Sequence, residues 1–209
     1  MGKLDDILFY SGTFNPIHCG HLQIVLNVKN KLNLKKIILV PTYNPYHKET
    51  NCIPSFESRL EMTKIAVQDM KDIEVSDIDK RANDGNSYSF NTVTLFIQEF
   101  FNNKDISTDE KLNFLIGADA FEKLESWYKY KELAKLVKFI IVSRPDYQEI
   151  DQAILNISSS IPNFKYEKIY QNYPISSSKI RENIKNDLTI KNLVPNKVAT
   201  YILENKLYK

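Results

Sequence analysis

The sequence has few of the residues on which disulfide-stabilised and zinc-stabilised domains depend. Its 209 residues include two cysteines, three histidines, five glycines and one tryptophan. Cys19 and Cys52 cannot form a disulfide framework, and their spacing fits no four-ligand zinc site. These absences exclude a small cystine-rich domain and a structural zinc module.

Long apolar runs and a strong charge of one sign are also missing. No apolar stretch approaches the length that spans a membrane, and the first ten residues lack the form of a signal peptide. Lysine and arginine number 28 against 26 acidic residues, a net charge of +2, and no basic stripe indicates a nucleic-acid partner. We therefore expect a soluble, cytoplasmic protein that binds neither membrane nor nucleic acid.

Short β-rich apolar runs alternate with longer amphipathic stretches along the chain. Strands are predicted at 7–11, 36–41, 73–78, 112–117, 138–143 and 165–170. Helices are predicted up to about Leu32, at 56–70 and 89–101, around Trp127, and near 177–186 and 195–205. This alternation predicts an α/β fold, a Rossmann-like, doubly wound and mostly parallel sheet with helices on both faces. We expect one domain, residues 1–209, with mobile loops near 44–55 and 79–88.

The segment SGTFNPIHCGH, residues 11–21, holds two of the three histidines directly after the first predicted strand. Gly12 permits a tight turn there. If the next helix begins near His18, then His18 and His21 lie on one face of its first turn, where unpaired N–H groups favour a phosphate. Imidazole donors at that place would stabilise oxygens that gain charge in phosphoryl or nucleotidyl transfer. Two alternatives remain for this motif alone: surface histidines that cap a helix, and a metal site of His18, Cys19 and His21.

GTFNPIHCGH at the end of a first strand resembles the HxGH signature with which a nucleotidyltransferase superfamily binds ATP phosphates. That superfamily's second signature, ISSTxxR, is similar to ISSSKIR at 175–181, where Ser178 replaces threonine. Serine is as good an N-cap as threonine, so the helix start should survive the exchange. The resemblance implies that Arg181 reaches the β- and γ-phosphates. Taken alone, ISSSKIR also fits an ordinary serine-capped helix with a surface arginine.

Four further segments resemble the bacterial nicotinate-nucleotide adenylyltransferases, and with them the resemblance covers nearly the whole chain. They are PTYNPYHK (41–48), GNSYSFNT (85–92), LIGADAFEKLESWYKYKEL (115–133) and VSRPDY (142–147). The corresponding family patterns are NPPHK, GPSYTxDT, IGADxxxxLxxWYxxxxL and a segment whose arginine lies beside adenine. Without the family, His47 and Lys48 would be ordinary solvated loop residues and Trp127 an ordinary core aromatic.

The resemblance implies a role for residues in each of these segments. Those implied to act in catalysis are His18, His21, Lys48 and Arg181. Those implied to bind ATP are Gly12, Thr13, Phe14, His18, His21, Gly117, Asp119, Arg144, Ser176, Ser177, Ser178 and Arg181. Those implied to bind the mononucleotide are Asn44, His47, Lys48, Ser87, Tyr88, Ser89, Asp119, Trp127 and Tyr128. Backbone N–H groups around 87–89 would receive the nicotinate carboxylate, and the pyridine ring would stack on Trp127.

The implied reaction transfers AMP from ATP to nicotinate mononucleotide, giving deamido-NAD and pyrophosphate in NAD biosynthesis. Mg²⁺ would accompany ATP through its phosphates, and no protein residue is named as a metal ligand. The alternatives are a related adenylyltransferase acting on nicotinamide mononucleotide or phosphopantetheine, and a non-catalytic dinucleotide-binding protein on the same fold. The oligomeric state is not predicted.

One departure from the family pattern lies beside the expected nucleotide. Ser11 stands where the family has the first glycine of Gly-Gly-Thr. If this position required φ > 0, serine would be strained by roughly 1–3 kcal/mol. If the position requires only a small residue, serine fits.

Overall fold

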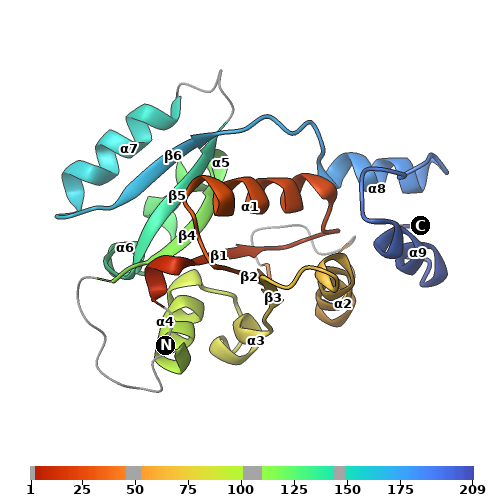
Figure 1. Cartoon of the computed structure of the whole chain (residues 1–209), viewed down its shortest axis with the longest axis horizontal. Helices are drawn as coiled ribbons and strands as arrows, with labels where there is room; N and C mark the ends of the chain where they lie inside the picture. The colour runs from red at the N-terminus through yellow and green to blue at the C-terminus, as the bar shows by residue number, and fades with distance from the viewer. Residues whose placement is uncertain (1–2, 46–52, 101–109, 144–148) are drawn as a thin grey trace.

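The computed structural model describes residues 3–45, 53–100, 110–143 and 149–209, and its six strands form one sheet (Figure 1). The strands are β1 (Ile7–Gly12), β2 (Lys36–Pro41), β3 (Ile73–Val75), β4 (Leu112–Gly117), β5 (Val137–Ser143) and β6 (Tyr166–Tyr170). Their order is β3-β2-β1-β4-β5-β6, and every pairing is parallel. The order reverses between β1 and β4, so the carboxyl ends of these two strands flank the switch point at which such sheets bind ligands.

Helices cover both faces of the sheet, as predicted. They are α1 (Cys19–Lys31), α2 (Phe56–Val67), α3 (Ile78–Ala82), α4 (Ser89–Phe100), α5 (Ala118–Phe121), α6 (Tyr130–Leu136), α7 (Glu149–Ser160), α8 (Ser177–Lys185) and α9 (Asn196–Glu204), with 3-10 turns η1 (Leu4–Asp6) and η3 (Leu124–Ser126). Neighbouring strand residues enter different cores because successive side chains point to opposite faces. Phe9 belongs to the core that also contains residues of α4, α6 and α7, whereas Leu8 belongs to the core that contains residues of α1, α2 and α9. Within the described residues, no helix is long and apolar enough to cross a membrane.

The strand predicted at 73–78 is shorter than expected, because β3 ends at Val75. The Ser76 side-chain oxygen accepts a hydrogen bond from the Ile78 N–H (3.2 Å), a local bond that competes with the strand ladder and turns the chain into α3. Part of the loop expected near 79–88 is therefore helical. Of the loop expected at 44–55, residues 46–52 lie outside the described part of the chain.

The helix predicted around Trp127 is divided into three short pieces, α5, η3 and α6. Trp127 itself lies between the last two, with extended backbone angles (φ −76°, ψ 142°). Lys129 then adopts a left-handed conformation (φ 51°) directly before α6. This break brings the backbone of Trp127 and Tyr128 out of any helix.

Helix α7 was not predicted, although its sequence carries the signal. Ile150, Ile154 and Ile157 follow the i, i+4, i+7 spacing of an amphipathic helix, and each is at most 4% exposed. They complete the core that contains Phe139.

We expect Ile154→Ala to lower the free energy of unfolding by about 2–5 kcal/mol, since it opens a cavity in that core. Leu155→Ala, one residue further and 62% exposed, is the matched control and should change it by no more than about 0.5 kcal/mol. Urea denaturation measures both. Equal losses in the two variants would contradict the packing of α7.

Candidate active site

The two histidines of the HxGH segment cap the first turn of α1 reciprocally. His18 is the N-cap residue, and its Nδ1 accepts a hydrogen bond from the His21 N–H (3.3 Å). In return, Nδ1 of His21 accepts from the His18 N–H (3.2 Å). The two rings are stacked with their centroids 3.6 Å apart. The predicted helix start and shared face are therefore confirmed, and the cap is a capping box built from imidazoles.

These bonds determine which ring nitrogen carries the proton. Because Nδ1 is the acceptor in both rings, each neutral imidazole has its proton on Nε2 and donates from there. Burial lowers the pKa of His18 to about 4, so this side chain is neutral at pH 7. The turn thus presents N–H donors at the carboxyl end of β1 without adding a full positive charge from His18.

Gly20 leaves the space that the His18 ring occupies, a role that the sequence analysis did not assign. A Cβ at this position would lie 3.1 Å from His18 Nδ1 and 3.4 Å from Ile175 Cβ. Phe14 supports the other ring, because it is 2% exposed and meets His21 edge-on with centroids 5.3 Å apart. The Phe14 side chain therefore packs inside the turn, and the contact with ATP predicted for Phe14 stays a prediction.

In the loop before the histidines, the residue with a left-handed backbone conformation is Phe14 and not Ser11. Ser11 is paired with Val40 inside β1 and has no positive φ, so the strain considered for this position does not arise. Phe14 has φ 45°, and its ring lies 3.1 Å from where a Cβ on Gly12 would be. Gly12 is needed for this close approach rather than for a left-handed turn.

The second signature docks directly on the first, across more than 150 residues of sequence. The Ser177 hydroxyl donates to the Pro16 carbonyl (3.0 Å), and the Arg181 guanidinium donates through Nη1 to the Asn15 carbonyl (2.8 Å). The helix N-cap is Ser176, whose side chain accepts from the Lys179 N–H, and not the residue that replaces the family threonine.

That residue, Ser178, has a different contact. Its Oγ accepts from Nη2 of Arg181 (3.2 Å) and so orients the guanidinium. The geometry thus brings Ser176, Ser177, Ser178 and Arg181 beside the histidine turn, as the sequence indicated.

The carboxyl end of β4 lies beside the carboxyl end of β1 and carries two further predicted site residues. Gly117 is exposed, and a Cβ on it would meet nothing within 4 Å. Asp119 follows in α5 and is also exposed. Arg144, predicted to lie beside the adenine, is outside the described residues, as are His47 and Lys48. Their roles remain predictions.

The loop after β2 and the start of α4 are hydrogen-bonded to each other. The Asn44 N–H donates to Ser87 Oγ (2.9 Å), and the Ser87 N–H donates to the Asn44 carbonyl (3.3 Å). The Tyr88 N–H donates to Asn83 Oδ1 (3.0 Å). Of the predicted 87–89 donors, two are thus engaged within the protein. Ser89 is the first residue of α4, where N–H groups have no partner inside the helix.

Tyr128 lies against this helix start, and Trp127, beside it in sequence, packs on the sheet. The Trp127 ring is half-buried and meets Phe114 edge-on (6.4 Å between centroids). The Tyr128 ring is 44% exposed and lies 4.7 Å from the ring of Tyr88. The structure therefore brings Tyr128 to the segment that begins α4, and the grouping of Ser89 and Trp127 with them stays a prediction.

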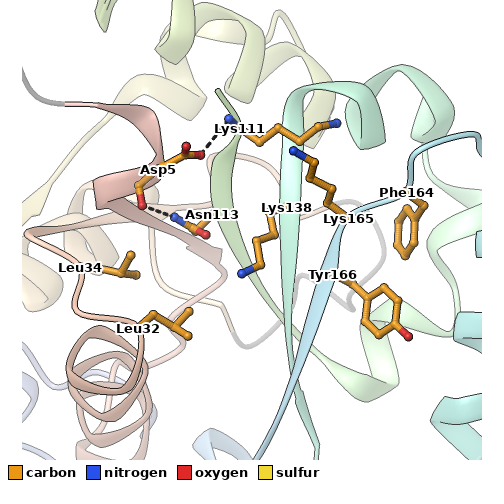
Figure 2. A pocket seen from close by; sticks show the side chains of 9 residues that line it. All are labelled: Asp5, Leu32, Leu34, Lys111, Asn113, Lys138, Phe164, Lys165 and Tyr166. Atoms are coloured by element: carbon orange, nitrogen blue, oxygen red, sulfur yellow. Dashed lines mark hydrogen bonds between the residues drawn. The ribbon is translucent and has the colours of Figure 1, made fainter. Parts of the chain in front are cut away.

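A cavity of about 590 Å³ lies at the amino ends of the strands, opposite the carboxyl ends at which the candidate site lies (Figure 2). It is lined by Asp5, Leu32, Leu34, Lys111, Asn113, Lys138, Phe164, Lys165 and Tyr166. Two of its lysines have partners, since Nζ of Lys111 donates to the Lys135 carbonyl (3.0 Å) and Lys138 pairs with Glu167 (2.7 Å). None of the predicted site residues that the structure describes lines this cavity, which lies where β4, β5 and β6 begin.

The parallel sheet with the histidine turn after β1 is the arrangement expected of a nucleotidyltransferase, and the Cytidylyltransferase-like family model matches residues 9–183. A probable nicotinate-nucleotide adenylyltransferase of Fusobacterium nucleatum is 38% identical over 200 residues, 94% of this chain and 96% of its own. The nicotinate-nucleotide adenylyltransferase of Bacillus subtilis is 33% identical over 200 residues, 96% of each chain. The chain belongs to the nicotinate-nucleotide adenylyltransferase family, which confirms the resemblance.

Solved structures show the same fold. The nicotinic acid mononucleotide adenylyltransferase of Plasmodium falciparum complexed with NaAD superposes with a TM-score of 0.74, covering 97% of this chain and 96% of its own at 22% identity. The predicted α/β architecture with a parallel sheet is therefore confirmed by comparison as well.

We expect His18 to titrate at about pH 4 and to keep Nδ1 unprotonated above that value. Unfolded histidine titrates near pH 6.5, so the unfolded chain binds the additional proton between these values, and stability falls as pH drops from about 6.5 through about 4. Nitrogen-15 NMR of the imidazoles measures both the midpoint and the tautomer. A midpoint near 6.5, or a proton on Nδ1, would contradict the capping geometry.

Gly20→Ala should lower turnover by roughly tenfold or more, because the added methyl displaces the His18 ring by a few tenths of an ångström. Alanine favours a helix by about 1 kcal/mol over glycine, so this loss should come without a lower melting temperature. Steady-state kinetics and thermal unfolding of the same preparation test this. Unchanged kcat would show that the ring position is unimportant.

Proposed function

We propose that this protein transfers the adenylyl group of ATP to nicotinate mononucleotide and releases pyrophosphate, an activity of NAD biosynthesis. The observation that carries the proposal is the reciprocal histidine cap at the carboxyl end of β1, with Arg181 docked on the same loop. Homologues at 33–38% identity over most of the chain support the activity.

The nucleophile is the 5′-phosphate of the mononucleotide, which is already ionised. One of its oxygens bonds to the α-phosphorus in line, and the bond from that phosphorus to the pyrophosphate oxygen breaks. No covalent enzyme intermediate is required, so the protein contributes positioning and charge stabilisation. We assign His21 to the α-phosphate, His18 to the β/γ side, and Arg181 with Lys48 to the negative charge of the leaving pyrophosphate.

Mg²⁺ enters this proposal as the companion of ATP. Among the described residues, no three histidine, cysteine, aspartate or glutamate side chains gather as a metal site. Mg²⁺ commonly binds through substrate phosphates and waters with few protein ligands, so we assign it to the phosphates of ATP and name no protein ligand. Its contribution would be to neutralise phosphate charge.

For the acceptor, we assign the nicotinate carboxylate to backbone N–H groups of Ser89 and Tyr128, with the pyridine ring on Trp127 and Asp119 on a ribose hydroxyl. Ser89 opens a twelve-residue helix, whose N-terminal dipole favours an anion. A carboxylate accepts from two N–H groups at once, whereas a carboxamide turns its own NH₂ towards one of them. The site should therefore select nicotinate over nicotinamide.

The deciding experiment is pyrophosphate release with ATP, Mg²⁺ and each mononucleotide at matched concentration. We expect kcat/KM about tenfold or more higher with nicotinate mononucleotide, since the amide leaves a donor unpaired. Comparable rates would contradict the carboxylate assignment. Absence of release with both would contradict the function and leave phosphopantetheine as the next acceptor to test.

His21→Ala should lower kcat by about 10²–10³, the usual cost of one donor to a charged transition state. Lys179→Ala on α8 is the control, because its side chain is exposed and its ion pair is with Glu182 on the same helix. Equal activity of the two variants would contradict the role of His21.

A further inference from the structure

Two buried side chains of opposite charge bind the backbone of Tyr43, one at its N–H group and the other at its carbonyl group. The Tyr43 N–H donates to Oδ2 of Asp79 (2.6 Å), and its carbonyl accepts from Nη2 of Arg59 (3.1 Å). Arg59 is 1% exposed and Asp79 is 2% exposed. Burying a charge is costly unless every polar contact is satisfied, so these two residues call for an explanation beyond packing.

Arg59 connects this peptide to the loop that carries the histidines. Its Nη1 donates to the Thr13 carbonyl (2.8 Å) and its Nε to the Pro54 carbonyl (3.2 Å), while Nη2 holds Tyr43. All of these acceptors are main-chain carbonyls: Thr13 lies in the loop after β1, and Tyr43 and Pro54 lie near the two ends of the loop between β2 and α2. The guanidinium is thus committed to the protein and is not placed to bind a phosphate itself.

Asp79 connects the same peptide to the start of α4. It accepts hydrogen bonds from the hydroxyls of Ser87 and Thr92 and from Nδ2 of Asn83 (3.2 Å), in addition to the Tyr43 N–H. An ionised carboxylate only accepts, and here four donors converge on it. Ser87 and Thr92 stand on either side of Ser89 in the sequence, so Asp79 fixes the helix start against which Tyr128 lies.

The contacts form one continuous path from the nucleotide side to the acceptor side: Thr13, Arg59, Tyr43, Asp79, Ser87. We propose that Arg59 and Asp79 are positioning residues that fix the distance between the two substrate loops, so that the acceptor phosphate meets the α-phosphorus in line. This inference rests on the proposed function. Neither residue is exposed enough to touch substrate, and both act through the loops that they hold.

The proposal predicts different effects at the two ends of the path. In Asp79→Asn the amide NH₂ faces at least one of the four donors, which loosens the 87–89 segment while Arg59 still holds Thr13. We expect kcat to fall by about 10²-fold and KM for nicotinate mononucleotide to rise, with KM for ATP within about twofold. In Arg59→Lys, which loses the planar fork, KM should rise for both substrates.

Matched variants separate positioning from general destabilisation. Asp77→Asn, two residues away and half-exposed, should leave kcat and both KM values unchanged. Thr92→Val keeps the side-chain shape and removes one donor to Asp79, whereas Thr94→Val in the same helix removes only a bond to the Phe90 carbonyl. Thr92→Val should raise KM for nicotinate mononucleotide several-fold, and Thr94→Val should not. This pair decides the matter if Asp79→Asn fails to fold.

Affinities measured by titration calorimetry, with nicotinate mononucleotide and with a non-hydrolysable ATP analogue, complete the test independently of turnover. Wild-type protein that releases pyrophosphate, together with folded variants whose kcat and affinities match it, would overturn the inference and leave the proposed function standing. Wild-type protein without turnover would overturn the proposed function and this inference with it. A selective loss of mononucleotide affinity in Thr92→Val and Asp79→Asn supports the positioning role.

Discussion

Each histidine of the HxGH turn accepts the other's backbone N–H, and the chemistry of the site depends on this reciprocal bond. It satisfies two N–H groups that a helix start would leave unpaired, and it places both protons on Nε2. The neighbouring packing preserves it, since Gly20 makes room for one ring and Phe14 supports the other. The start of α1 and the tautomer of both imidazoles are therefore consequences of a single pair of contacts.

The features that could be predicted from the sequence are those whose signal lies in consecutive residues. The strands are short apolar runs that alternate with longer amphipathic stretches, so the succession of strands and helices along the chain could be derived from the local pattern. Both signatures are likewise continuous in sequence, and the structure joins them through Ser177 and Arg181. Where local pattern was ambiguous, prediction was wrong: the serine that caps α8 is Ser176, and β3 ends before Ser76 turns the chain.

The residues that sequence reasoning missed are buried polar groups whose partners come from distant loops. In the sequence, Arg59 is one charged position on an amphipathic helix, and Asp79 lies in a stretch rich in charge. Nothing local shows that both are almost fully buried and meet at Tyr43. Only the tertiary arrangement turns them from solvated charges into internal supports. In contrast, the spacing of Ile150, Ile154 and Ile157 in α7 is a local signal that the sequence alone contains.

The bonding pattern of Arg59 has a consequence for how this site tolerates mutation. Its three acceptors are main-chain carbonyls, which every amino acid possesses. The side chains at positions 13, 43 and 54 can therefore vary without removing any of these bonds, whereas replacing the arginine removes all of them together. The loop residues can therefore change while the loops keep their geometry, and the requirement for a particular side chain falls on position 59 alone among these four positions.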